Sequence, residues 1–201
     1  LLGLDWNRDT HTVTAQVKVT NNGAPNYTGK SKDVVQLYVQ LPYEAGQAEK
    51  SAIQIADFEK TSALAAGESE TVTLSFSDYI FAAYDSNAVN GADTSRKGCY
   101  VFDAGDYYFA IGNGAHDALN NVLAARGVTG MFDAEGNAVS GDAAKAQKVT
   151  LTETDNVTYA VSPQTGEVVS NLFEDRDINH FIPDTVTYLT RSDWNTFPET
   201  V

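Results

Sequence analysis

Three oxygen-bearing side chains stand at alternate positions in Asp175-Arg176-Asp177-Ile178-Asn179, as they do at the start of a calcium-binding loop. A complete loop of this type also needs a glycine for the sharp turn after the third ligand, and a glutamate that closes the coordination shell. The sequence has His180 and Val186 at those two places. We therefore expect no metal here, and interpret the segment as a solvated acidic turn or the start of a short helix.

Groups for nucleophilic or acid–base catalysis do not assemble into a known motif. The histidines His11, His116 and His180 are scattered, and no two of them have the spacing of metal ligands. The sequence contains no serine–histidine–aspartate order, no glycine-rich phosphate loop and no histidine–glutamate zinc motif. A single cysteine, Cys99, excludes an internal disulfide and a cysteine-based zinc site. We expect no cofactor and no catalytic residue in this chain.

Aromatic side chains suggest a different kind of chemistry, because flat rings stack on the faces of sugar rings. Most of the tyrosines alternate with core residues or lie in loops where a β-sandwich places such rings in any case. Tyr84, with Asp85 and the loop that runs on to Lys97, is the best candidate for a sugar contact. Two strings, Asn26-Tyr27-Thr28 and Asn156-Val157-Thr158, match the N-glycosylation pattern, but this pattern is common by chance.

Charge and composition limit the partners that the protein can bind. The 201 residues include 13 Lys+Arg and 27 Asp+Glu, which gives a formal net charge of −14. Such a chain repels phosphate backbones, and no basic cluster offsets this, so we expect no nucleic-acid partner. Hydrophobic residues make up 42% of the sequence, which suffices for a packed core. The apolar runs fall far short of the ~20 residues that span a bilayer, so we expect no membrane partner.

An alternation of apolar and polar residues with period two runs through the first half of the chain. It is clearest in residues 13–19, 35–41 and 72–76, where it is typical of strands with one buried face. Shorter runs at residues 53–58, 81–84, 98–102 and 107–111 bring the number of strands to about seven, with turn signals between them. This pattern predicts an all-β fold, a sandwich of two antiparallel sheets. Leu37 is expected in the middle of it, facing the opposite sheet.

Two stretches depart from the strand pattern. Residues 115–126 have Leu119, Val122 and Leu123 on one face of a predicted helix, and Gly127 suits its C-terminal cap. Beyond the helix, glycine-, aspartate- and alanine-rich loops surround short β-like runs at residues 148–151, 157–161 and 186–189, without a core of their own.

From these stretches we predict three parts of the chain. Residues 1–112 form the sandwich, residues 113–127 a short helix, and residues 128–201 an extended connector toward a catalytic domain outside this sequence. The earlier aromatic residues of the connector, Phe173, Phe181 and Tyr188, should pack back on the sandwich. Trp194 and Phe197 should stay free to contact a partner.

Several strings in the first half resemble the fibronectin type III-like domain of glycoside hydrolase family 3, the β-glucosidase family. They are VKVTNNG (17–23), DVVQLYV (33–39), FEKT (58–61), LAAGESETV (64–72), FAAYD (81–85) and AGDYYFAIG (104–112). Ala66 departs from the proline that the family usually has before Gly-Glu, which costs only some turn rigidity. The resemblance implies a fibronectin type III/immunoglobulin-like sandwich.

Two later strings, GAHDALNN (114–121) and YLTRSDW (188–194), resemble the connector of bacterial family members with permuted domain order, where the catalytic barrel follows the sandwich. In this family the nucleophile is an aspartate in a Ser-Asp-Trp string, which would be Asp193. Residues 185–191 are unlike the glycine-rich strand that precedes the family's nucleophile, and a retaining glycosidase needs a second carboxyl group about 5 Å away. We therefore expect Arg191 and Asp193 to pair or cap, and Trp194 to anchor the linker on a neighbour.

The resemblance implies a non-catalytic accessory domain that braces the catalytic domains of the same parent chain. The parent would hydrolyse terminal β-linked glucose or a similar sugar, and the single cysteine and the lack of a signal-type stretch favour a cytoplasmic location. The alternative is an independent carbohydrate-binding or cell-surface adhesion module. An aromatic row on a flat sheet would favour that module, whereas an exposed apolar patch favours domain docking. Sugar or domain contacts are expected at Tyr84, Asp85, Trp194 and Phe197.

Overall fold

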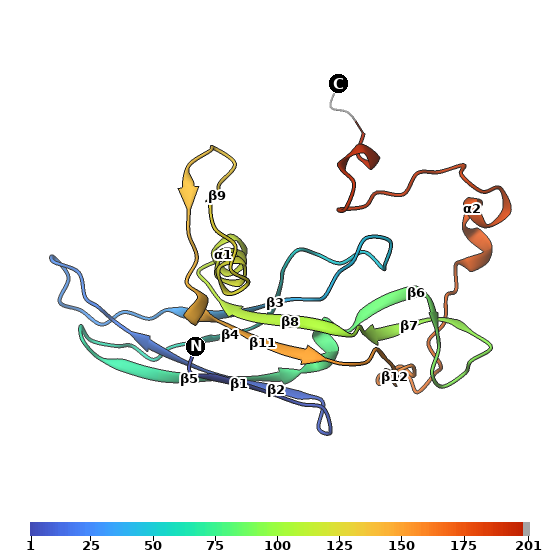
Figure 1. Ribbon diagram of the computed structural model, residues 1–201. Coiled ribbons are helices and arrows are strands. Elements are labelled where there is room, and N and C mark those ends of the chain that lie inside the picture. The colour runs from blue at the N-terminus through green and yellow to red at the C-terminus, as the bar shows by residue number, and fades with distance from the viewer. Residues whose placement is uncertain (199–201) are drawn as a thin grey trace. The chain divides into compact units, whose positions relative to one another are not determined.

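The computed structural model describes residues 1–198, which fold mainly as antiparallel strands (Figure 1). The chain forms two compact units, each assembled from separate stretches of sequence. Unit 1 comprises Leu1–Pro42, Ser51–Phe81 and Gly105–Thr152, and unit 2 comprises Tyr43–Lys50, Ala82–Ala104 and the residues from Glu153 onward. The boundaries expected at residues 112 and 127 stay predictions, and residues 199–201 of the expected connector lie outside the described residues.

Unit 1 is a sandwich of two antiparallel sheets. The three-stranded sheet has the order β1 (Gly3–Asn7), β2 (Thr12–Thr20), β5 (Ser69–Ser77). The four-stranded sheet has the order β11 (Ala146–Leu151), β8 (Gly105–Ile111), β3 (Val34–Gln40), β4 (Gln54–Lys60). The predicted all-β sandwich is confirmed, and in Figure 1 the sheets lie one above the other.

The core between the two sheets follows from the alternation along the strands. Its fully or almost fully buried side chains include Val13, Ala15, Val17, Leu37, Val39, Leu74, Tyr107 and Phe109. Leu37 is 0% exposed, which confirms its predicted position. Toward one end of the core, the ring of Trp6 packs edge-on against Phe81 at 4.9 Å and Tyr107 at 5.1 Å between centroids.

A buried carboxylate fixes the start of the chain to the end of β5. Asp78 opens the short helical turn η1 (Asp78–Phe81) and is 0% exposed. Its Oδ2 accepts hydrogen bonds from Trp6 Nε1 at 2.9 Å and from Arg8 Nη1 at 3.0 Å. Because a buried charge needs partners to offset its desolvation, these bonds tie the β1–β2 hairpin to η1.

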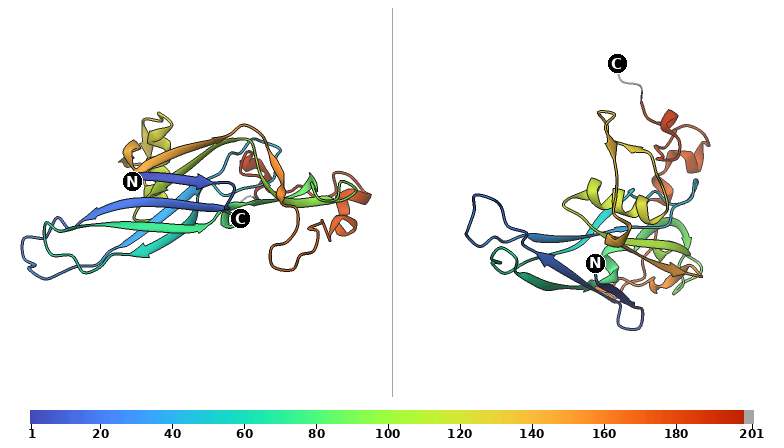
Figure 2. Two further views of the ribbon diagram at one scale, coloured as in Figure 1. Left: turned by 90° about the horizontal axis from the view of Figure 1, so that it is seen from below. Right: turned by 60° about the vertical axis from the view of Figure 1, so that its left-hand side comes forward.

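Helix α1 (Ala115–Ala125) packs on the face of the four-stranded sheet that points away from β1, β2 and β5 (Figure 2). Ala118 and Val122 of the helix share a buried cluster with Tyr38 and Ala110 of the sheet. Strand β3 is therefore covered on both faces, which explains why Tyr38 is buried beside Leu37 and Val39.

The predicted helix is present, but its buried face differs from the one expected. Ala118, Asn121 and Val122 are buried, whereas Leu119 and Leu123 are only partly covered. Small residues allow a close approach here, since a Cβ on Gly112 would lie 2.5 Å from the nitrogen of Ala118.

The remaining elements of unit 1 connect the helix to the last strand. A short hairpin of β9 (Met131–Phe132) and β10 (Ala138–Val139) is followed by η2 (Ala143–Lys145) and then β11. Strand β11 pairs along the whole of β8, from Ala146 opposite Ala110 to Leu151 opposite Gly105. The β-like run at residues 148–151 is thus an outer strand of the sandwich.

Unit 2 contains a three-stranded antiparallel sheet with the order β12 (Asp155–Tyr159), β7 (Lys97–Phe102), β6 (Ala83–Val89). Its small core includes Cys99, Val101, Phe102, Tyr159 and Ala160. Beyond the sheet, the described residues up to 198 form short helical turns, η3 (Glu174–Arg176), α2 (Ile178–Phe181) and η4 (Trp194–Thr196), and two isolated β-bridges.

The side chains of these turns correct one expectation. Phe173 is 73% exposed and Phe181 64% exposed, and Tyr188 is also exposed, so these rings do not pack back on a core. Turns of three or four residues offer no continuous apolar face that could bury them. None of the helices in residues 1–198 is long and apolar enough to cross a membrane.

Candidate functional site

Asp193, the one aspartate in a Ser-Asp-Trp string, acts as a helix cap. Its Oδ1 accepts hydrogen bonds from the backbone nitrogen of Asn195 at 3.0 Å and from its side-chain amide at 2.9 Å. The next residue, Trp194, is 77% exposed and packs against the ring of Phe197 at 5.1 Å between centroids. Asp193 is itself exposed and serves as a cap, so it does not lie in an enclosed site of the kind that holds a sugar between two carboxyl groups.

The acidic segment 175–179 also uses its carboxylates for local structure. Asp177 Oδ1 accepts the backbone N–H of Asn179 at 2.9 Å, which caps α2, and it accepts the hydroxyl of Tyr188. These bonds lower the pKa of the Asp177 carboxyl and raise the pKa of the Tyr188 hydroxyl. Residues 1–198 hold no cluster of three or more histidine, cysteine, aspartate or glutamate side chains arranged for a metal ion.

The three histidines lie apart. His11 sits beside the buried Asp78, with 3.7 Å between Nδ1 and Oδ2, and has a φ of 52°. His116 is exposed in the first turn of α1, and His180 lies against the ring of Phe181.

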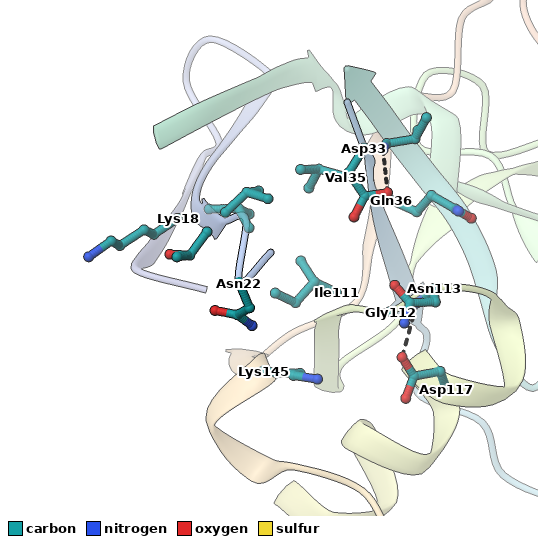
Figure 3. Close-up of a pocket in the computed structure, with 14 residues that line it drawn as sticks. Lys18, Asn22, Asp33, Val35, Gln36, Ile111, Gly112, Asn113, Asp117 and Lys145 are labelled. Atoms are coloured by element: carbon teal, nitrogen blue, oxygen red, sulfur yellow. Dashed lines mark hydrogen bonds between the residues drawn. The ribbon is translucent and has the colours of Figure 1, made fainter. Parts of the chain in front are cut away.

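A cavity of about 370 Å³ opens in unit 1 beside the start of α1 (Figure 3). Val17, Val35 and Ile111 supply its apolar part, and the polar lining includes Lys18, Lys145, Asp33 and Asp117. Both carboxylates are engaged by nearby backbone. Asp117 accepts the N–H of Asn113 at 3.0 Å, and Asp33 accepts the N–H of Val34 at 2.8 Å. In both residues one carboxylate oxygen thus serves the local backbone.

A second cavity, of about 390 Å³, lies in unit 2 between the loop of residues 46–49 and residues 84–87 of β6. We call it the Tyr84 pocket. Its lining offers the carboxylates of Glu49 and Asp85, the amides of Gln47 and Asn87, and the hydroxyl of Ser86, together with the ring of Tyr84. The structure thus brings the two sequence candidates Tyr84 and Asp85 together with side chains from a distant loop.

Tyr84 is held in place by its neighbours in unit 2. Its ring packs edge-on against Tyr100 at 5.5 Å, and its hydroxyl donates a hydrogen bond to the carbonyl of Ser170 at 3.3 Å. Burial is the largest cause that raises the pKa of the Tyr84 hydroxyl. The side chain is still 41% exposed, so part of the ring remains open to a ligand.

The loop that forms the other wall of the Tyr84 pocket is anchored by Arg191. The guanidinium lies over the ring of Tyr43, 4.0 Å from its centroid, and Nη1 donates to the carbonyl of Lys50 at 2.8 Å. Glu49 accepts the Tyr43 hydroxyl at 2.9 Å and the backbone N–H of Arg191 at 3.3 Å. These contacts, with the hydroxyl of Thr190 as the largest cause, lower the pKa of Glu49.

We call these four residues, Tyr43, Glu49, Lys50 and Arg191, the Arg191 clasp. The Nζ of Lys50 pairs with Oδ2 of Asp103 at 2.7 Å, and both side chains are largely covered. Sequence reasoning did not find the clasp, because its parts lie more than 140 residues apart and carry no motif. Arg191 therefore contacts the other members of the clasp. Of Arg191 and Asp193, which we expected to pair or cap, only Asp193 caps a helix.

Comparison with known proteins agrees with the sequence strings. Residues 33–115 match the family model of the fibronectin type III-like domain. A stretch of 63 residues is 49% identical to probable beta-glucosidase F of Aspergillus flavus and covers 31% of this chain and 7% of that protein. A stretch of 106 residues is 31% identical to a beta-glucosidase of Ruminococcus albus and covers 53% of this chain and 10% of that protein.

Among solved structures, a beta-glucosidase from Paenibacillus barengoltzii aligns with a TM-score of 0.49 at 27% identity, covering 76% of this chain and 13% of that one. The chain thus spans about a tenth or less of the length of the curated relatives it matches. The resemblance to the fibronectin type III-like domain of family 3 β-glucosidases is confirmed.

Proposed function

We propose that this chain, which contains a fibronectin type III-like domain, is a non-catalytic accessory domain of a β-glucosidase-type hydrolase. In this proposal it braces the catalytic domains of the same parent chain, and the parent hydrolyses terminal β-linked glucose or a similar sugar. The β-glucosidase relatives, of which the matched stretch is a small part, support this assignment. The permuted domain order, with the catalytic barrel following the sandwich, belongs to the same proposal.

The observation that carries the docking role is a set of exposed apolar side chains between residues 172 and 197, which we call the tail surface. Its members are Leu172, Phe173, Phe181, Ile182, Tyr188, Leu189 and Trp194. A buried aromatic side chain covers on the order of 150–250 Å², so Phe173, Phe181 and Trp194 together leave roughly 400 Å² of apolar area in water. So many exposed large apolar side chains in one short segment favour an interaction role for it.

The arrangement of these rings also separates the two candidate functions. A carbohydrate-binding or adhesion module would present its aromatic row on a flat sheet face. The tail-surface rings instead lie on turns and on helices of three or four residues. This placement favours docking on a protein domain over binding to a polysaccharide surface.

The first test asks whether the chain has catalytic activity by itself. Because Asp193 is engaged as a cap, the purified 201-residue chain should not hydrolyse p-nitrophenyl β-glucoside. Hydrolysis that survives purification and disappears in Asp193→Asn would overturn the accessory-domain proposal.

The second test asks whether the tail surface docks. In the parent enzyme, Phe173→Ser with Phe181→Ser should lower the melting temperature by several degrees, because each change removes an aromatic contact with the catalytic domains. In the isolated chain the same pair should change it little, since both rings are exposed. Phe58→Ser is the matched control, a phenylalanine of unit 1 that is 60% exposed. Equal effects of tail and control variants in the parent enzyme would contradict docking through this surface.

A further inference from the structure

The Tyr84 pocket has a chemical character that the docking role does not use. Its polar groups are two carboxylates, two amides and a hydroxyl, and its lining contains no lysine, arginine or histidine. The carboxylates accept hydrogen bonds, the amides both donate and accept, and the ring of Tyr84 adds a flat apolar surface. A ligand with several hydroxyl groups and one apolar face matches this set.

Residues 85–87, which line this pocket, belong to a β-bulge in β6. Asp85 pairs with Cys99 and Val89 with Lys97, so three residues of β6 stand opposite the single residue Gly98 of β7. A bulge re-aims side chains and is a frequent device next to binding sites. Within the bulge, Asp85 Oδ1 accepts the backbone N–H of Asn87 at 2.8 Å and of Ala88 at 3.2 Å.

These bonds leave ligand-binding groups available on the same residues. Among the residues that the structure describes, Asp85 Oδ2, the hydroxyl of Ser86 and the side-chain amide of Asn87 have no hydrogen-bond partner. The bulge thus offers an acceptor, a hydroxyl and an amide on consecutive residues.

Gly98 is the residue that allows Tyr84 to reach its position. Its φ is +89°, and a Cβ there would lie 2.6 Å from the Tyr84 hydroxyl and 2.5 Å from the nitrogen of Asn171. Because Gly98 has no side chain, the Tyr84 hydroxyl fits against the backbone of β7 at a place where a Cβ would collide with it. Tyr84 then packs against Tyr100, which fixes the plane of its ring.

The opposite wall is ordered before a ligand arrives. Glu49 is bonded to Tyr43 and Arg191 of the clasp, which fixes the end of the 46–49 loop. A wall held by existing contacts lowers the ordering cost that binding would otherwise carry. The hydroxyl of Thr190, followed by the contacts with Arg191 and Tyr43, lowers the pKa of Glu49, so the wall carries a negative charge at neutral pH.

Other ligand classes fit this lining less well. Phosphates and other anions would meet two carboxylates and no cation. A calcium ion takes six to eight oxygen ligands, usually with several carboxylates, and residues 1–198 hold no cluster of three such groups. A neutral sugar ring carries neighbouring hydroxyl groups for the carboxylates and amides, and C–H groups that stack on an aromatic ring.

We propose that the Tyr84 pocket binds one neutral hexopyranose, with Asp85, Asn87 and Glu49 on its hydroxyl groups and Tyr84 against its face. The proposal concerns unit 2 of this chain alone and goes beyond the accessory role. In a parent enzyme it would hold a sugar unit on the accessory domain.

Amide chemical shifts of the ¹⁵N-labelled 201-residue chain test this directly, with methyl β-D-glucoside and cellobiose as probes. Saturable shifts should appear at residues 47–49 and 84–87, with a Kd on the order of 1 mM. Asn87→Ala and Asp85→Asn should each weaken binding about tenfold or more, the loss of one good polar contact. Asp85→Asn keeps the Oδ1 acceptor of the bulge, so the fold of β6 is retained.

The control variant is Asn113→Ala, an exposed asparagine that lines the other cavity (Figure 3), and it should bind the sugars as the unchanged chain does. The control ligands are sorbitol, which has hydroxyl groups but no ring, and calcium chloride. Three results would each overturn the proposal. They are the absence of saturable shifts with either sugar, equal shifts with sorbitol, and shifts at residues 47–49 and 84–87 with calcium alone. Such a failure leaves the docking role intact, because the variants of the tail surface test that role separately.

Discussion

Leu37→Ala is the sharpest test of how unit 1 is packed. Leu37 lies in β3, opposite Asp57 of β4 and Ile111 of β8, and its side chain is 0% exposed. The change removes three carbon atoms, worth about 0.8 kcal/mol each in lost burial, or about 2.4 kcal/mol together. The cavity adds to this, because a strand paired on both edges and covered by α1 has little freedom to close it. We expect a loss of about 3–5 kcal/mol in the free energy of unfolding.

Urea unfolding followed by tryptophan fluorescence can measure this loss for unit 1. The chain has two tryptophans, and they differ sharply in environment. Trp6 is buried in the core of unit 1, whereas Trp194 of unit 2 is 77% exposed and should change its emission little. The midpoint should fall while the slope m stays constant, which is the mark of a change in stability alone.

Phe58→Ala is the control for this prediction. Phenylalanine is larger than leucine, but Phe58 is 60% exposed on β4, so its removal should cost about 0.5 kcal/mol or less. A loss below about 1 kcal/mol for Leu37→Ala would contradict the described core. So would an equal loss for the two variants, since burial would then not decide the cost.

Three further predictions concern unit 2. Gly98→Ala should destabilise unit 2 and shift the amide signal of Asn171. Gly46→Ala is the control, because Gly46 has a similar φ of +88° but no atom near its Cβ position, so this change should strain only its own loop. Amide spectra of both variants measure the difference. The pKa of Glu49 is lowered in the folded chain, so its contribution to stability is present above about pH 4.5 and is lost as the pH falls through the lowered value. The amide signals of the 43–50 loop should therefore change only in that acidic range. A change of these signals near neutral pH would contradict this prediction. Burial raises the pKa of the Cys99 thiol, so its reaction with Ellman's reagent should be at least about 100-fold slower in the folded chain than in urea, and rapid reaction without urea would contradict its burial.

Strands with a long alternation can be predicted from the sequence, and a strand with a short one cannot. Residues 13–19 alternate strictly and form β2, whereas in β1 the alternation covers only Leu4 to Asn7, which is too short a run to distinguish a strand from a loop. The sequence predicts strand β4, but its exposed residues include the apolar Ile55 and Phe58, and Ala56 is the buried one. A register shift between β3 and β4 lies at Leu37 and Tyr38, and such an irregularity depends on the partner strand rather than on local sequence.

Only part of the Tyr84 pocket can be predicted from the sequence, because the other part depends on contacts between distant segments. Tyr84 and Asp85 could be singled out as an aromatic and an acid in one loop-like run. Gln47 and Glu49 belong to a segment without periodicity or motif, and only the fold of unit 2 brings them opposite β6. The sequence suggests that Arg191 and Asp193 pair or cap, but the guanidinium of Arg191 lies over the ring of Tyr43.

The late position of β11 in the sequence has a consequence for any shortened version of this protein. Residues 146–151 shield the outer edge of β8, which carries the buried rings of Tyr107 and Phe109. A chain cut after the helix, at residue 127, would leave the amide and carbonyl groups of that edge unpaired beside an apolar face. Such an edge is a template for a strand from another copy, so the fragment would tend to aggregate rather than stay monomeric. The smallest soluble piece of unit 1 therefore has to reach Leu151.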